Sequence, residues 1–288
     1  VARRYFYSIG KPNKNRILCI KNSFHGRTLA AIYASGSKKM TEGFGPKVPG
    51  FDHIKFRELK PRFPNIRNKI KKTTAAIMVE TILGEGGIKP IPDKCLRYLR
   101  RICNEKKILL ILDEVQCGIG RSGKFFAFEH AKIKPDIVPI AKGIGGGFPI
   151  GAVLVNKKVA SGMKPGSHGS TFGGNPLACA VAIEAIDVLI EEKLIERSAE
   201  LGDQLKKGLE NIKSEHVNFI RGQGLMIGIV LTDAAGGARR FCEELKMRGL
   251  LCKETHENVI RITPPLVIKK EELDWAIDQI TQVLETME

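Results

Sequence analysis

Short runs of apolar residues alternate with amphipathic stretches over the first 160 residues of the chain. Five such runs are almost entirely apolar, and they cover residues 16–20, 75–79, 108–112, 136–140 and 151–155. Strands that are buried on both faces of a parallel sheet have this composition. The intervening stretches, such as residues 93–105, are long enough for helices. The pattern predicts an α/β domain with a mainly parallel sheet.

The pattern changes in the last third of the chain. Residues 176–212 have a helical pattern, and residues 219–231 and 259–262 have the composition of strands. Two further helices are expected at 238–248 and 270–286, and the second carries one apolar stripe. We therefore expect a large domain over residues 1–189 and a small C-terminal α+β domain over residues 190–288.

Composition and charge narrow the class of protein. The chain has 288 residues and a formal net charge of +16, but aromatic residues make up only 6% and do not interleave with the basic runs. Solvated helix faces therefore explain the charge better than a nucleic-acid surface does, and no nucleic-acid partner is expected. No apolar run is long enough to span a membrane, and no signal peptide is visible, so neither a membrane partner nor secretion is expected.

The cysteines and histidines do not form a metal-binding or disulfide pattern. Seven cysteines occur without a C-x-x-C pair, and six histidines occur without an H-E-x-x-H pair. This predicts reduced thiols in a cytoplasmic protein and no metal site.

Polar residues follow four of the apolar runs. The first run precedes the stretch Asn-Ser-Phe-His-Gly-Arg at residues 22–27, and the second ends in Glu80. The third ends in Asp113, and Lys142 follows the fourth. Because the carboxyl ends of parallel strands lie at one edge of the sheet, these residues are expected to line a ligand site.

Asp113 and Lys142 together suit one cofactor. Pyridoxal phosphate requires a lysine that holds it covalently and an acidic group that keeps its ring nitrogen protonated. A structural ion pair between the two residues is the alternative. The glycine-rich residues 118–123 match G-x-G-x-x-G, but they do not follow a strand directly or open into a helix, so a dinucleotide site is not predicted.

Five motifs in order resemble the class III aminotransferases. They are Phe-His-Gly-Arg-Thr at 24–28, Gly-Glu-Gly-Gly at 84–87, Asp-Glu-Val-Gln at 113–116, Ala-Lys-Gly at 141–143 and Gly-Ser-Thr-Phe-Gly-Gly-Asn-Pro at 169–176. The resemblance extends over the whole chain and is greatest to members that act on N-acetylornithine, with those that act on ornithine close behind. It implies the type I fold of pyridoxal-phosphate transferases, with the large domain binding the cofactor.

The resemblance also implies roles for individual residues. Lys142 would hold pyridoxal phosphate and transfer the substrate proton, Asp113 would pair with the pyridine nitrogen, and Gln116 would lie near the ring oxygen. Thr171 would reach the cofactor phosphate from the neighbouring subunit of a homodimer with a shared active site. The residues implied in cofactor binding are Phe24, Asp113, Glu114, Val115, Gln116, Lys142 and Thr171. Phe24 and Val115 would lie on the two faces of the ring.

A second group is implied in substrate binding, and it consists of Arg27, Ser170, Glu80, Glu85 and Arg261. Arg27 and Arg261 would each bind a carboxylate, because a guanidinium group matches a carboxylate with two parallel hydrogen bonds. Glu85 would pair with Arg261 when the substrate offers no carboxylate there.

The implied reaction moves the terminal amino group of N-acetylornithine or ornithine to 2-oxoglutarate, in arginine biosynthesis in the cytoplasm. Alternatives are an ornithine or 4-aminobutyrate aminotransferase, glutamate-semialdehyde aminomutase, or an inactive truncated product.

Two positions depart from the family pattern, Thr81 in place of proline and Leu83 in place of glutamine. The chain also begins at Val1, and we expect an N-terminal segment with a phosphate-binding loop in the parent protein.

Overall fold

The computed structural model describes residues 1–59 and 65–287, which form two compact units. Unit 1 consists of Val1–Thr81, Ile91–Gln116 and Phe128–Ala185. Unit 2 consists of Ile82–Pro90, Cys117–Ala127 and the described residues from Ile186 onward. Each unit is described by itself.

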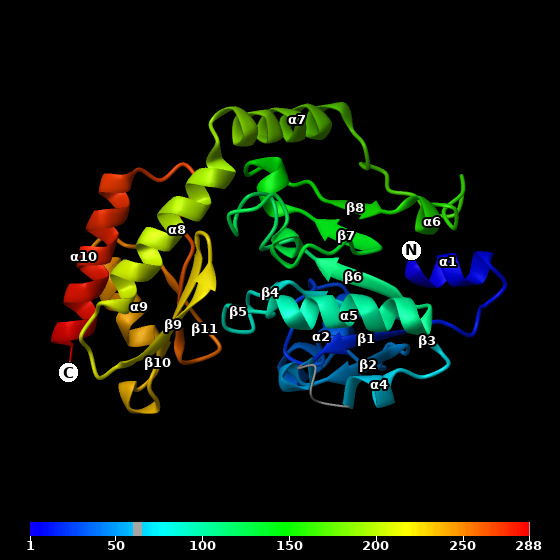
Figure 1. Ribbon diagram of the computed structural model, residues 1–288, viewed down its shortest axis with the longest axis horizontal. Helices are drawn as coiled ribbons and strands as arrows, with labels where there is room; N and C mark the ends of the chain where they lie inside the picture. The colour runs from blue at the N-terminus through cyan, green and yellow to red at the C-terminus, as the bar shows by residue number, and fades with distance from the viewer. Residues whose placement is uncertain (60–64, 288) are drawn as a thin grey trace. The chain divides into compact units, whose positions relative to one another are not determined.

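Unit 1 is built on a six-stranded sheet in the order β2-β1-β3-β6-β7-β8 (Figure 1). The strands, in chain order, are β1 (Arg16–Ile20), β2 (Phe51–Ile54), β3 (Thr74–Glu80), β6 (Leu109–Asp113), β7 (Ile137–Ile140) and β8 (Ala152–Val155). Every neighbouring pair is parallel except β7 and β8. The prediction of an α/β fold with a mainly parallel sheet is confirmed.

Two edge strands differ from the expectation. β2 was not predicted, because Phe-Asp-His-Ile has only two apolar residues and forms no apolar run. β8 was expected to be buried on both faces, and this was wrong: Val153 and Leu154 are exposed. β8 is an edge strand next to β7. Its apolar composition therefore did not predict its burial correctly.

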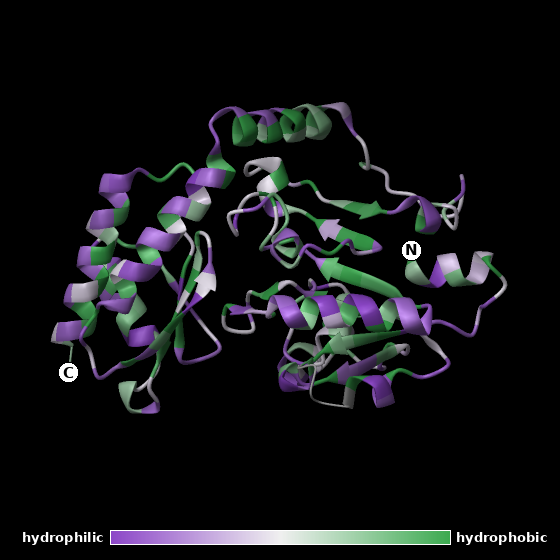
Figure 2. Cartoon of the chain, in the orientation of Figure 1, coloured by the Kyte–Doolittle hydropathy of each residue, from purple (hydrophilic) through white to green (hydrophobic). Residues whose placement is uncertain are grey.

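Helices cover the sheet of unit 1. Tyr5 and Phe6 of α1 (Ala2–Ser8) pack against Ala76, Leu109 and Ile111. The long amphipathic helix α5 (Asp93–Lys106) contacts β3 and β6, and Figure 2 shows its polar and apolar residues in alternation. The remaining α-helices of this part of the chain are α2 (Leu29–Ser35), α3 (Lys38–Thr41), α4 (Asn65–Lys69), α6 (Lys157–Ala160) and α7 (Pro176–Glu191).

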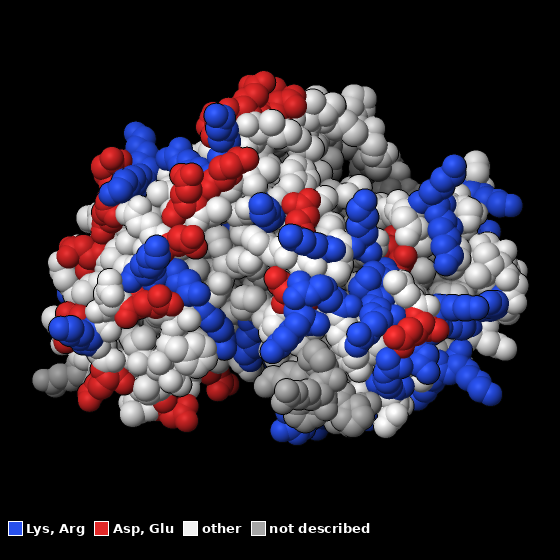
Figure 3. Space-filling view, in the orientation of Figure 1, with Lys and Arg blue, Asp and Glu red and all other residues white. Residues whose placement is uncertain are grey.

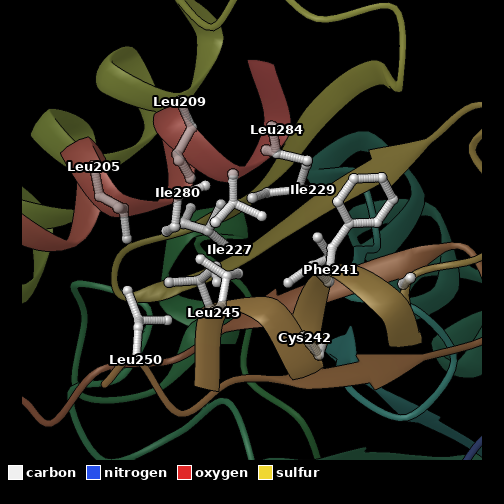
Figure 4. Close-up of a cluster of buried hydrophobic side chains, with 14 of the residues drawn as sticks. Leu205, Leu209, Ile227, Ile229, Phe241, Cys242, Leu245, Leu250, Ile280 and Leu284 are labelled. Atoms are coloured by element: carbon white, nitrogen blue, oxygen red, sulfur yellow. The ribbon is translucent and has the colours of Figure 1, made fainter. Parts of the chain in front are cut away.

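Unit 2 contains an antiparallel sheet in the order β11-β12-β10-β9, with a separate β4-β5 pair. The strands are β4 (Ile82–Leu83), β5 (Lys89–Pro90), β9 (Val217–Gln223), β10 (Met226–Leu231), β11 (Lys253–Thr255) and β12 (Val259–Ile262). The helices are α8 (Leu194–Glu210), α9 (Arg239–Met247) and α10 (Lys270–Thr286). Leu205, Ile229, Phe241 and Ile280, from three helices and β10, meet in one core (Figure 4).

Basic side chains gather over the part of the surface where α5 lies, with acidic side chains between them (Figure 3). Two arginines of α5 are paired: Arg100 contacts Asp136 at 2.8 Å, and Arg101 lies 3.8 Å from Glu105. Within residues 1–59 and 65–287, no helix combines the length and the apolar composition that crossing a bilayer requires.

Candidate active site

The ends of four adjacent strands bring the predicted polar residues of unit 1 to one edge of the sheet. Glu80 and Asp113 are the last residues of β3 and β6 and are direct neighbours in the strand register. Phe24 follows β1 on one side of this pair, and Lys142 follows β7 on the other. The parallel order β1-β3-β6-β7 therefore produces the cluster that the sequence predicted.

Asp113 is buried and held on both carboxylate oxygens. Its Oδ2 lies 2.7 Å from Nδ1 of His25, and its Oδ1 accepts the backbone N–H of Val115 at 3.0 Å. Nε2 of His25 lies 3.0 Å from the hydroxyl of Ser23, and that hydroxyl donates to the carbonyl of Ile20 at 2.8 Å. Contacts to both carboxylate oxygens fix the orientation of the Asp113 carboxylate.

The two glutamates at the strand ends anchor the surrounding backbone. Oε1 of Glu80 accepts the backbone N–H of Phe24 at 2.8 Å. Oε1 of Glu114, which is fully buried, accepts the Thr81 hydroxyl at 2.6 Å and the Phe128 N–H at 3.1 Å. Thr81, a departure from the family pattern, thus satisfies a buried carboxylate. The substrate role of Glu80 and the cofactor role of Glu114 stay predictions.

Lys142 begins a short 3-10 turn, Lys142–Gly145, directly after β7. Its φ of 51° lies in the left-handed region, which is uncommon for a residue with a side chain. Gly146, with φ of 53°, ends the turn. Lys142 is exposed. Lys107, Lys132 and Lys193 are exposed and have similar φ values, so the position of Lys142 after β7, not its backbone geometry, distinguishes it.

Gln116 and Phe24 complete the group in unit 1. Oε1 of Gln116 is buried and has no hydrogen-bond partner within the described residues. A buried polar atom of this kind is satisfied when a ligand binds. The Phe24 ring lies below the Arg27 guanidinium, with the ring centroid 5.3 Å from Cζ, and Arg27 itself is exposed.

Ser170 and Thr171 lie in an exposed turn before α7. In the described part of the chain, no side-chain hydrogen bond joins either residue to the strand-end group. Both residues are exposed in the structure. The role of Thr171 toward the cofactor and that of Ser170 toward the substrate stay predictions.

Glu85 and Arg261 pair within unit 2. Arg261 lies on β12, and its Nη1 is 2.6 Å from Oε1 of Glu85, which lies between β4 and β5. The side chain of Arg261 is 17% exposed and that of Glu85 is 34% exposed, so solvent reaches both. The Thr255 hydroxyl donates to the Glu85 carbonyl at 2.8 Å and holds the backbone of this segment. The predicted carboxylate–guanidinium partnership is present as an ion pair.

Comparison with known proteins decides the family. The family model "Aminotransferase class-III" matches residues 1–284. The chain belongs to the class III aminotransferases.

Relatives and solved structures agree with this assignment. The chain is 47% identical to ornithine aminotransferase 2 of Staphylococcus saprophyticus over 287 residues, which are 99% of this chain and 71% of that protein. Ornithine aminotransferase from Toxoplasma gondii, crystallised with oxidised glutathione, superposes with a TM-score of 0.88 at 36% identity, over 98% of this chain and 68% of that one. Acetylornithine aminotransferase from Elizabethkingia anophelis gives 0.83 at 35% identity, over 98% and 69%.

This aminotransferase is a pyridoxal-phosphate-dependent transaminase. The residues present fit that cofactor. The fixed Asp113 carboxylate suits a protonated ring nitrogen, the buried oxygen of Gln116 requires a polar partner, and Lys142 supplies an accessible amine. One further residue, His25, was given no role in the sequence analysis. Its place in the Phe-His-Gly-Arg-Thr motif was the signal that could have assigned it to Asp113.

Proposed function

We propose that this aminotransferase moves the δ-amino group of ornithine to 2-oxoglutarate, with N-acetylornithine as the second candidate donor. The observation that carries the proposal is the partly exposed Glu85–Arg261 pair. The relatives at 46–48% identity are named ornithine aminotransferases, which supports ornithine. The similarity to an acetylornithine aminotransferase supports the acetylated donor.

The pair suits a reaction whose two substrates differ beside the reacting carbon. The δ-carbon of ornithine carries no carboxylate, whereas the α-carbon of glutamate does. While Glu85 neutralises Arg261, that arginine offers no free charge to a carboxylate. When the pair opens, the guanidinium binds the α-carboxylate of glutamate or 2-oxoglutarate through two hydrogen bonds. Arg27, which is exposed, is the proposed partner of the second carboxylate.

Pyridoxal phosphate, when bound, supplies an electron-accepting ring that stabilises the negative charge left on a substrate carbon after its proton departs. Asp113, fixed by His25 and the N–H of Val115, would accept a hydrogen bond from the ring nitrogen and keep the proton there. Nζ of Lys142 would hold the cofactor and would accept the proton from the substrate carbon. Phe24 and Val115 would pack on the two faces of the ring.

A second copy of the chain is the proposed partner. Phe172, Leu177 and Ile183 are 80%, 63% and 60% exposed, which is unusual for large apolar side chains so close together in sequence. Their burial in a homodimer would also place the neighbouring Thr171 at the subunit interface. The proposed setting is the cytoplasm, in arginine biosynthesis.

The proposal is tested with the purified chain, pyridoxal phosphate and single donors. We expect a cofactor absorbance band that resists dialysis, that is bleached by ornithine, and that is absent from Lys142→Ala. Lys124→Ala, a lysine change in unit 2, is the matched control and should behave as the wild type.

The proposed homodimer is tested by light scattering, which should give twice the 31.8 kDa chain mass. Bleaching by 4-aminobutyrate but not by ornithine or N-acetylornithine would overturn the substrate assignment. Failure to retain cofactor would favour an inactive product.

A further inference from the structure

Three basic side chains from distant parts of the sequence surround Gly87 in unit 2. Lys89 lies on β5, Arg221 on β9, and His256 in the turn between β11 and β12. A side-chain carbon built on Gly87 would lie 3.0 Å from Nη2 of Arg221, 3.4 Å from Cβ of His256 and 3.6 Å from Cε of Lys89. The three side chains therefore converge on one face of one backbone position.

These three side chains have no acidic partner among the described residues. Arg221 donates through Nε, at 2.9 Å, and through Nη2 to the carbonyl of Gly87, and its Cζ lies 5.5 Å from the centroid of the Phe219 ring. Its Nη1 group makes no hydrogen bond in the described part of the chain. The side chains of Lys89 and His256 likewise form neither a hydrogen bond nor an ion pair with any described residue.

Other basic residues of unit 2 are paired with acids. Arg239 contacts Glu243 at 3.0 Å, Arg248 contacts Glu244 at 3.1 Å, and Lys270 contacts Asp274 at 2.7 Å. All of these pairs lie on helix surfaces, where water already screens charge. Lys89 and Arg221 are half-buried and His256 is exposed, yet none of the three forms an ion pair with a described residue.

The protein environment disfavours the positive charges of this group. Burial lowers the pKa of Lys89, and the charge of Arg221 lowers it further. Burial also lowers the pKa of Arg221. For His256, burial and then Lys89 lower the pKa, and Glu257 opposes them with a smaller effect than that of Lys89. A bound anion would stabilise the positive charges of Lys89 and Arg221, which burial disfavours.

We infer that Lys89, Arg221 and His256 form a binding site for a small phosphate-bearing anion. The ammonium, the Nη1 group and the imidazole offer donors of three kinds around one point, and charge-assisted hydrogen bonds to phosphate are strong. Lys89 and Arg221 carry two formal charges, which a phosphate dianion balances and a monocarboxylate does not. None of the three residues belongs to the set proposed for cofactor or amino-group transfer, so the site is independent of that proposal.

The test is calorimetric titration of inorganic phosphate into the chain saturated with pyridoxal phosphate, which keeps the cofactor's own phosphate place filled. We expect one phosphate per chain. Lys89→Met should weaken binding by about tenfold or more, because a hydrogen bond to a charged group contributes roughly 1.5–3 kcal/mol. His256→Asn is an independent second variant, since asparagine tolerates the φ of 52° at this position.

Lys207→Met is the matched control, because Lys207 is an exposed lysine on α8 of the same unit and the change removes the same charge. It should bind phosphate as the wild type does. Without phosphate, Lys89→Met should melt no lower than the wild type, because it removes a repelled charge. Absence of saturable phosphate binding, or equal binding by wild type, Lys89→Met and His256→Asn, would overturn the inference. Equally tight acetate binding, lost in the same variants, would overturn the choice of phosphate.

Discussion

Unit 1 and unit 2 each hold a carboxylate against a basic side chain, and the two pairs differ in how firmly they are fixed. Asp113 and His25 meet at 2.7 Å with side-chain exposures of 9% and 4%. Glu85 and Arg261 meet at 2.6 Å with exposures of 34% and 17%. Similar contact distances therefore occur in different environments. The first pair is desolvated, whereas water competes with the second.

Further hydrogen bonds hold the Asp113–His25 pair in place. Asp113 also accepts the N–H of Val115, and His25 also contacts Ser23, so movement of either side chain breaks several hydrogen bonds. A carboxylate that must face one fixed atom of a cofactor needs this rigidity. Arg261, which is proposed to bind the carboxylate of only one of the two substrates, needs an ion pair with Glu85 that can open. The two ion pairs therefore differ in burial far more than in contact distance.

The largest effect is expected for Asp113→Ala. The change leaves the buried His25 without its acidic partner, and removal of one member of a buried pair costs about 3–5 kcal/mol of stability. Without the carboxylate that would face the cofactor's ring nitrogen, the activation free energy should rise by a similar amount. We therefore expect kcat to fall by about 10³-fold. Thermal unfolding and kcat measure the two effects separately. Asp136→Ala, which breaks the Arg100 pair elsewhere in unit 1, is the control and should lose stability without a comparable loss of kcat in the folded fraction. An active Asp113→Ala protein would contradict the assigned role.

A smaller and more selective effect is expected for Glu85→Gln. The neutral amide holds Arg261 less strongly, so the arginine is more available to a substrate carboxylate. We expect the ratio of kcat/KM for glutamate to kcat/KM for ornithine to rise by about three- to tenfold, as loss of one partly exposed charged contact allows. Glu243→Gln, which weakens the exposed Arg239 pair, should leave that ratio unchanged. An unchanged ratio in Glu85→Gln would mean that the pair does not select between substrates.

The sequence predicted the parts of the site that depend on strand order. Apolar runs located β1, β3, β6 and β7, and parallel pairing then placed Asp113 and Lys142 at the same edge of the sheet, where the structure shows β6 and β7 as neighbours. Both inferences use local composition and one topological rule. The strand-like runs of the C-terminal part located β9, β10 and β12, but neither their antiparallel pairing nor β11 was predicted.

Contacts between distant segments could not be predicted in this way. His25 reaches Asp113 across 88 positions, and no periodicity marks the pairing. Arg221 reaches the carbonyl of Gly87 across 134 positions, so the basic group around that glycine has no local signature. At least one glycine of residues 118–123 is explained by close packing: a side-chain carbon on Gly123 would lie 2.8 Å from Cβ of Ala199.

The smallest effect concerns a third pair, at the edge of the sheet in unit 1. Arg16 on β1 contacts both carboxylate oxygens of Asp52 on β2, at 2.7 and 2.8 Å. The hydrogen bond from Arg16 holds the pKa of Asp52 below its usual 3.8. A carboxyl group with a lowered folded-state pKa stabilises the fold fully above its unfolded pKa and loses this contribution as pH falls through the folded value.

Asp52→Asn should therefore cost about 1 kcal/mol of unfolding free energy at pH 7, since the pair is only partly buried. The difference from the wild type should persist down to about pH 4 and disappear only below it, as Asp52 itself becomes protonated. Urea unfolding at several pH values measures this. Asp274→Asn, at a helix-surface pair on α10, is the control and should change the unfolding free energy less. A cost that grew as the pH fell would have the wrong sign for a carboxylate stabilised in the folded state, and the Asp52 contact would then not be the cause.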